Sequence, residues 1–135
     1  MYSRWPHCER DHHIGREFIY DGIAKVLGRL QEEEFFLIFR QSIEDEMKML
    51  LGESGMQSTF YHLHLEEVFR NPKELQRRLY SMFGTGSGLI ERTVLLKLYQ
   101  NIDVPFRERK GYGFAEYVDL ASRAFSANKR GRQNA

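Results

Sequence analysis

Residues 32–51, EEEFFLIFRQSIEDEMKMLL, constrain the fold more than any other stretch of this chain. Their apolar residues recur every three or four positions, the spacing that places side chains on one side of an α-helix. The predicted inner stripe consists of Phe36, Phe39, Ile43, Met47 and Leu50. Charged residues occupy the opposite side, and Gly52 follows as a helix stop. The stretch therefore predicts an amphipathic helix that ends at Leu51.

The same helical spacing continues toward the C-terminus. The clearest start signal is Asn71-Pro72, because asparagine is a good N-cap and proline fits the first helical position. Glu74, at the third helical position, can reach back to the cap amide. The predicted helices cover residues 32–51, 54–63, 72–83, 89–101 and 113–126. We therefore expect an all-α fold, a compact bundle of about five helices.

The two ends of the chain are predicted to be less regular than its middle. Residues 1–16 are expected to form a poorly ordered leader, residues 17–127 a single helical domain, and residues 128–135 a flexible basic tail. Between residues 17 and 31, helical spacing of Ile23, Val26, Leu27 and Leu30 competes with a β-hairpin that turns at Asp21-Gly22. Helix is the favoured interpretation, although three glycines weaken it.

Charge and composition exclude several classes of protein. The 135 residues include 20 Lys and Arg against 19 Asp and Glu, so the chain lacks the strong positive field of a dedicated nucleic-acid binder. There is no apolar run near 18 residues, so no membrane span is expected. The single cysteine cannot form an internal disulfide, and no secretory signal is apparent, which favours a cytoplasmic location.

Ligand-capable side chains gather near the N-terminus, where imidazoles and a thiol could hold a metal ion such as zinc. They are His7, Cys8, His12 and His13. We favour a polar leader over a metal site, because the chain has no cysteine pair to complete the set and the adjacent His12 and His13 point apart in either helix or strand. No paired acid and base or activated nucleophile is visible elsewhere. The sequence predicts no catalytic residues, no cofactor and no enzymatic activity.

Aromatic and apolar residues outside the inner stripes point to a second buried surface. They are Phe35, Leu37, Tyr61, Tyr80 and Tyr99. Helices that are apolar on more than one face need another surface to pack against. We therefore predict a homodimer or a protein partner. The predicted interface residues are Tyr61, Tyr80 and Tyr99, together with Gly55, whose small size permits close helix approach.

Basic residues in the last third of the chain support an alternative. Residues 102–135 carry 7 basic and 4 acidic side chains, and a lysine or arginine can contact a phosphate. The alternative prediction is a weak DNA- or RNA-binding regulator. It would use Arg107, Arg109, Lys110, Lys129, Arg130 and Arg132.

Four sequence motifs between residues 33 and 101 carry a family resemblance. They are LLGESGMQSTFYHL at residues 50–63, NPKEL at 71–75, MFGTGSGLIE at 82–91 and KLY at 97–99. In this order they resemble the Nitrosopumilus output domains, an uncharacterised archaeal family of helical domains. The resemblance covers about half of the chain and implies a regulatory or output module in archaeal signalling. Its motifs are structural, so it implies no active-site residues.

Overall fold

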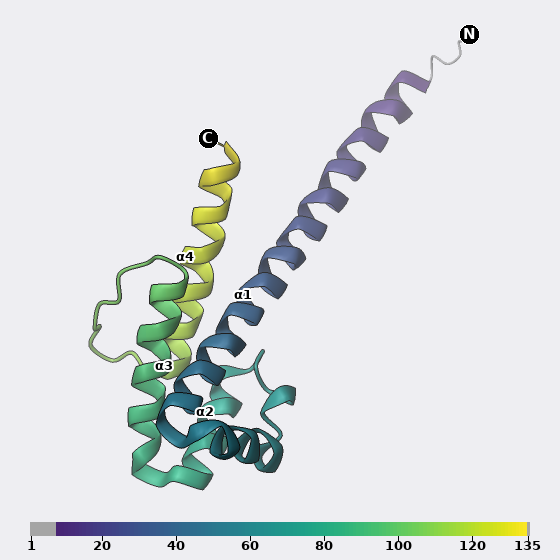
Figure 1. The fold of residues 1–135 in the computed structure, drawn as a ribbon. Helices are drawn as coiled ribbons and strands as arrows, with labels where there is room; N and C mark the ends of the chain where they lie inside the picture. Colours follow the sequence, from purple (N-terminus) through teal and green to yellow (C-terminus); the bar gives the residue numbers. More distant parts are fainter. Residues whose placement is uncertain (1–7, 135) are drawn as a thin grey trace. The chain divides into compact units, whose positions relative to one another are not determined.

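The computed structural model describes residues 8–134, with side chains described for most of residues 22–129. All regular structure in that part of the chain is helical (Figure 1). The elements are α1 (Cys8–Leu63), a 3₁₀ turn η1 (Leu65–Glu67), α2 (Pro72–Phe83), a 3₁₀ turn η2 (Gly84–Gly86), α3 (Ser87–Asn101) and α4 (Phe114–Asn134). The all-α prediction is confirmed, whereas the count of five helices is not.

The chain divides into two compact units, residues 1–33 and residues 34–135. In the first unit the described residues belong to α1 alone. The helical interpretation of residues 17–31 is therefore confirmed over the hairpin. Helix α1 begins at Cys8 and α4 continues to Asn134. The division of the chain into leader, helical domain and tail stays a prediction.

Gly52 interrupts α1 with a φ of 79° and a ψ of 170°. This backbone conformation is open essentially to glycine alone, because a Cβ would clash with the neighbouring peptide groups. The helix predicted for residues 32–51 therefore ends where expected, and residues after Gly52 form a separate helical piece up to Leu63. This second piece agrees with the predicted helix 54–63.

The second unit is held together by one apolar core to which all four helices contribute. Its most deeply buried apolar side chains are Phe35, Phe39, Ile43, Met47, Leu65, Leu75, Leu79, Val94, Leu98 and Val118. The residues of α1 in this list, from Phe35 to Met47, are spaced four residues apart. The predicted inner stripe was wrong at its two ends, because Phe36 is only half-buried and Leu50 is exposed.

Helix α4 closes the core against α1, α2 and α3. Figure 1 shows α3 and α4 side by side, joined by the irregular segment 102–113. The ring of Phe114 at the start of α4 lies 6.1 Å from that of Phe39, and the ring of Phe125 lies 5.9 Å from that of Phe35. These contacts fix one face of α1 against α4 and leave its opposite face outside the core.

The start of α2 matches its sequence signal in part. Asn71 Oδ1 accepts a 3.2 Å hydrogen bond from the Glu74 amide, as an N-cap does. The predicted return contact from the Glu74 carboxylate to the cap amide is wrong. That carboxylate instead bonds to Arg77 and Arg78, and the Asn71 amide donates to the Val68 carbonyl.

Candidate functional site

Two of the predicted interface tyrosines are exposed. Tyr61 lies on the last piece of α1 and is 75% exposed, and Tyr80 lies on α2 with its side chain also mostly in solvent. The Tyr61 ring contacts only its neighbour His62 among the described aromatic pairs, at 5.4 Å. Both side chains are accessible to a partner, and the interface itself stays a prediction.

Tyr99 is not accessible, and its prediction as a surface residue is wrong. It is only 3% exposed, with its ring 5.1 Å from that of Phe106. Burial raises the pKa of the Tyr99 phenol to about 12. Helix α3 packs against α4, and Phe106 of the segment 102–113 lies against the Tyr99 ring, so the side of α3 that carries Tyr99 is covered.

The small size of Gly55 is explained within its own chain. A Cβ added at Gly55 would lie 2.8 Å from the Cβ of Leu51, closer than two carbon atoms can approach. Leu51 and Gly55 stand on either side of the backbone break at Gly52, which alters the usual spacing between successive turns. Gly55 is therefore required by the local geometry of α1 before any partner is considered.

An apolar stripe follows one face of α1 in the first unit, and we call Ile23, Val26 and Leu30 the outward stripe. All three side chains are exposed, Val26 at 53% and Leu30 at 59%. At 100° per residue, the three lie within about 60° of one another around the helix. The first unit, taken by itself, is a single helix and cannot cover such a stripe.

The predicted basic loop is present on the surface. Arg107, Arg109 and Lys110 are all exposed in the segment between α3 and α4. The guanidinium carbon of Arg109 lies 5.7 Å from the ring centroid of Tyr112, a cation–π distance. The backbone of Arg109 is fixed by Tyr117, whose hydroxyl accepts from the Arg109 amide at 2.7 Å and donates to its carbonyl at 3.2 Å.

The basic residues at the C-terminal end are not joined to this loop by any described contact. Lys129 Nζ lies 2.9 Å from Glu34 Oε1 and 5.6 Å from the Phe125 ring centroid. The positive charge of Lys129 is thus paired with the carboxylate of Glu34. The side chains of Arg130 and Arg132 lie outside the described part of the chain.

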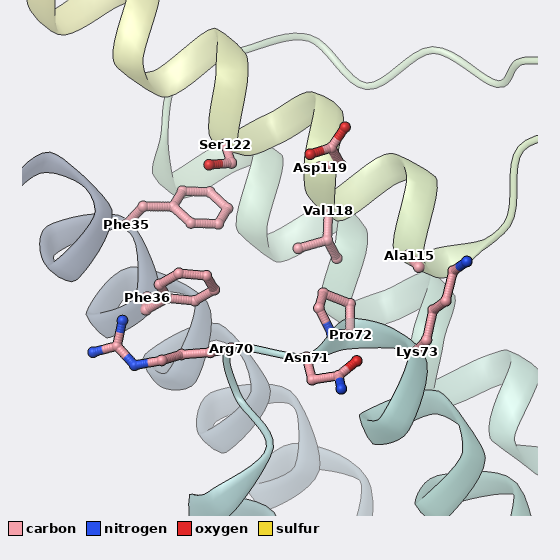
Figure 2. Close-up of a pocket in the computed structure, with 10 residues that line it drawn as sticks. All are labelled: Phe35, Phe36, Arg70, Asn71, Pro72, Lys73, Ala115, Val118, Asp119 and Ser122. Atoms are coloured by element: carbon pink, nitrogen blue, oxygen red, sulfur yellow. The ribbon is translucent and has the colours of Figure 1, made fainter. Parts of the chain in front are cut away.

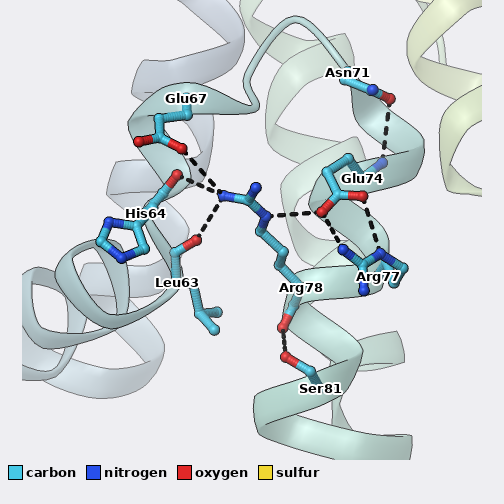
Figure 3. Close-up of polar contacts among 8 residues, drawn as sticks. All are labelled: Leu63, His64, Glu67, Asn71, Glu74, Arg77, Arg78 and Ser81. Atoms are coloured by element: carbon cyan, nitrogen blue, oxygen red, sulfur yellow. Dashed lines mark hydrogen bonds and ion pairs between the residues drawn. The ribbon is translucent and has the colours of Figure 1, made fainter.

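Arg78 on α2 lies at the centre of a network of polar contacts that reaches the end of α1 (Figure 3). Its Nη1 donates 3.0 Å hydrogen bonds to the carbonyls of Leu63 and His64, and its Nε donates to Glu74 at 2.9 Å. Hydrogen bonds from Arg77 and Arg78 lower the pKa of Glu74 to about 2. This network attaches the end of α1 to α2, so its role is structural.

A first cavity, of about 320 Å³, opens between α1, the start of α2 and α4 (Figure 2). Phe35, Phe36 and Val118 form its apolar walls. Lys73 and Asp119 stand at its polar side, and Asp119 is paired with Arg123 at 2.8 Å. The charged side chains at this cavity are therefore mixed in sign and partly paired.

A second cavity, of about 210 Å³, lies between α2, α3 and the segment before α4. Its lining combines the carboxylate of Glu91 with the rings of Phe106, Tyr112 and Tyr117. The sequence predicted neither cavity, because each draws its walls from several segments that are distant in the sequence.

The predicted metal ligands cannot be assessed from the geometry. His7 lies outside the described residues, as do the side chains of Cys8, His12 and His13. Among the side chains that the structure does describe, no group of three or more His, Cys, Asp or Glu is placed to hold a metal ion. Within the same part of the chain, no helix has the length and apolar character needed to cross a bilayer.

Comparison with known proteins adds no assignment. No protein-family model, curated protein or solved structure matches this chain. The similarity of residues 33–101 to the Nitrosopumilus output domains stays a hypothesis.

Proposed function

We propose that this chain is a non-enzymatic regulatory module that pairs with a second copy of itself along α1. The observation that supports the proposal is the outward stripe, three exposed aliphatic side chains on one helical face of the first unit. Burying an exposed Leu or Ile stabilises an association by roughly 1.5–3 kcal/mol per side chain before the entropic cost of pairing. A similar partner helix offers the simplest cover for such a face.

The spacing of the stripe suits helix pairing. Ile23 and Leu30 lie seven residues apart, with Val26 between them, as in the seam of a coiled coil. From Ile23 to Leu30 the seam is about 10 Å long at 1.5 Å per residue. This is one heptad, so we expect a weak dimer that dissociates on dilution.

Charges beside the stripe favour a second copy as the occupant. Lys25 and Arg29 occupy the turns before Leu30, and Glu32 occupies the turn after it. All three side chains are exposed. If two copies pair in antiparallel orientation about Leu30, the basic turns of one helix lie beside the acidic turn of the other. The attraction between these charges favours the antiparallel orientation. The resemblance to a family of output domains supports a regulatory role for such a dimer.

Light scattering and native mass spectrometry across a concentration series test the proposal. Wild-type protein should shift from monomer to dimer as concentration rises, and Leu30→Glu should remain monomeric. Leu89→Glu is the matched control, because Leu89 is also exposed, at 60%, but belongs to α3 and not to the stripe, so this substitution should leave the dimer intact. A monomer at every concentration, or an equal effect of the two substitutions, would refute the role of the stripe.

A second candidate function is weak nucleic-acid binding by the loop between α3 and α4. Its support is the exposure of Arg107, Arg109 and Lys110 in one loop, with the half-exposed ring of Tyr112 beside them. A cationic loop with an adjacent aromatic ring suits single-stranded nucleic acid, since the cations contact phosphates and the ring stacks on a base. The pairing of Lys129 with Glu34 reduces what the C-terminal end can add.

A further inference from the structure

Glu91 is a half-buried carboxylate with no cationic partner. It lies on α3 at the second cavity, where its Oε1 accepts a 3.4 Å hydrogen bond from Gln76 Nε2 and its carboxylate also bonds to Ser87. Among the described side chains, no lysine or arginine forms an ion pair with it. A carboxylate in this position is costly to ionise unless a positive charge comes close.

The remaining walls of this cavity are mainly aromatic. Phe106 and Tyr112 come from the segment before α4, and Tyr117 comes from α4. The Phe106 and Tyr112 rings lie 5.1 Å and 5.4 Å from that of Tyr117, so the three form one cluster. Aromatic rings attract cations through the negative charge of their faces, and more strongly where water is excluded.

The charges at the cavity sum to one negative. Arg92 also lines it, but its guanidinium is paired with Glu108 of the segment before α4. That pair is neutral overall, which leaves Glu91 as the uncompensated charge. A ligand that complements this cavity therefore carries one positive charge.

The size of the cavity limits the ligand. A volume of about 210 Å³ corresponds to roughly seven water molecules at about 30 Å³ each. A flat guanidinium group binds best to both oxygens of a free carboxylate, but Glu91 Oε1 already accepts from Gln76. A compact ammonium group needs only one of these oxygens.

We propose that this cavity binds a primary ammonium group on a short aliphatic chain, with the Glu91 carboxylate as its counter-ion and the rings of Phe106 and Tyr112 as its walls. The ammonium belongs either to a small amine or to a lysine side chain. This site does not depend on dimer formation, because its lining comes entirely from the second unit of one chain.

Binding should depend on pH through Glu91. Burial raises the pKa of the Glu91 carboxyl, and an ammonium ligand favours its ionised form. The other polar groups at the cavity come from every element around it. They are Gln76 on α2, Arg92 on α3, Glu108 and Tyr112 in the segment 102–113, and Tyr117 on α4. Affinity should therefore weaken as pH falls through the raised pKa of Glu91, with uptake of one proton on release.

Amide NMR titration of the full chain with butylammonium chloride tests the proposal, with n-butanol as the neutral probe of equal shape. Butylammonium should shift the amides of Gly88, Glu91 and Gly113 at millimolar concentration, and butanol should bind at least about tenfold more weakly, as expected for loss of a charge-assisted contact. Nα-acetyl-lysine amide distinguishes the sources, because tighter binding than butylammonium assigns the ammonium to a lysine side chain.

Two variants complete the experiment. Glu91→Gln keeps the shape of the side chain and should weaken butylammonium binding at least about tenfold. Glu53→Gln removes an exposed acid from α1 and should change nothing. Equal binding of butanol and butylammonium, unchanged binding in Glu91→Gln, or no shift at millimolar butylammonium would each overturn the proposal. The comparison of the two probes uses wild-type protein, so it holds even if Glu91→Gln is unstable.

Discussion

The hydroxyl of Tyr99 donates a 2.7 Å hydrogen bond to the carbonyl of Tyr117, and this bond joins α3 to α4 inside the core. Tyr117 in turn holds both the amide and the carbonyl of Arg109. The two tyrosines thus fix the irregular segment 102–113 against the helices on either side of it. The segment presents the basic loop and one wall of the second cavity, so both depend on this pair.

Removing the Tyr99 hydroxyl should destabilise the fold without changing its association. Tyr99→Phe loses one buried hydrogen bond, and we expect the free energy of unfolding to fall by about 1 kcal/mol. Urea denaturation followed by circular dichroism measures it. Tyr61→Phe serves as the control, since Tyr61 is exposed and should show no loss. If Tyr99→Phe instead weakened dimer formation at unchanged stability, the buried role of Tyr99 would be contradicted.

Alanine should have opposite effects at two glycines of α1. Gly52→Ala places a Cβ in a glycine-only conformation and should cost roughly 1–3 kcal/mol of unfolding free energy. Gly28→Ala adds a methyl group where no atom lies within 4 Å, and should stabilise the helix by up to about 1 kcal/mol. Urea denaturation measures the first change, and helix content by circular dichroism on heating measures the second. Equal effects of the same sign would be inconsistent with the break at Gly52.

The ion pairs of Glu74 should make stability fall in acid. Because its folded pKa is lowered to about 2 from 4.5, its contribution is complete above pH 4.5 and disappears as pH falls toward 2. We expect Glu74→Gln to be less stable than wild type at neutral pH, with the difference closing between pH 4.5 and 2. Urea midpoints measured across this range provide the comparison. Glu53→Gln should show no such pH-dependent difference, and a constant gap for Glu74→Gln would argue against the ion pairs.

Nucleic-acid binding, if it occurs at the basic loop, should respond to charge and salt together. The double variant Arg107→Ala, Lys110→Ala should weaken binding of single-stranded oligonucleotides in a gel shift. The slope of the logarithm of the binding constant against the logarithm of the salt concentration should become shallower by roughly 0.7 per lost phosphate contact. Lys48→Ala, Lys73→Ala removes the same charge from other surfaces and should have little effect. Equal losses in the two variants would indicate a nonspecific charge effect.

Local chemistry made α2 the most predictable element. Asn71, Pro72 and the apolar spacing of Leu75 and Leu79 define its start and its buried face within a few residues of sequence. Gly52 was equally readable as a stop, because the signal for a left-handed or extended glycine lies in the residue itself. These features depend on neighbours in sequence, and so the sequence could predict them.

Features that depend on distant segments could not be read in the same way. Tyr99 is buried because the segment 102–113 returns over α3, and nothing in the spacing of α3 reports that return. The uncompensated charge of Glu91 is equally invisible, since its surroundings come from α2, α4 and the loop between α3 and α4. The start of α1 at Cys8 was not predicted, because the polar residues before Gly15 show no apolar helical spacing.

Because the backbone is not helical at Gly52, the directions of the side chains before Gly52 do not fix the directions of those after it. In an uninterrupted helix, one inserted residue rotates every later side chain by about 100° and would turn the buried face of the following residues outward. Gly52 already has non-helical φ and ψ angles, and its two flanking pieces both contribute to the core. We therefore expect an insertion beside Gly52 to disturb the core less than the same insertion beside Phe39, which lies inside a continuous helical piece and is fully buried.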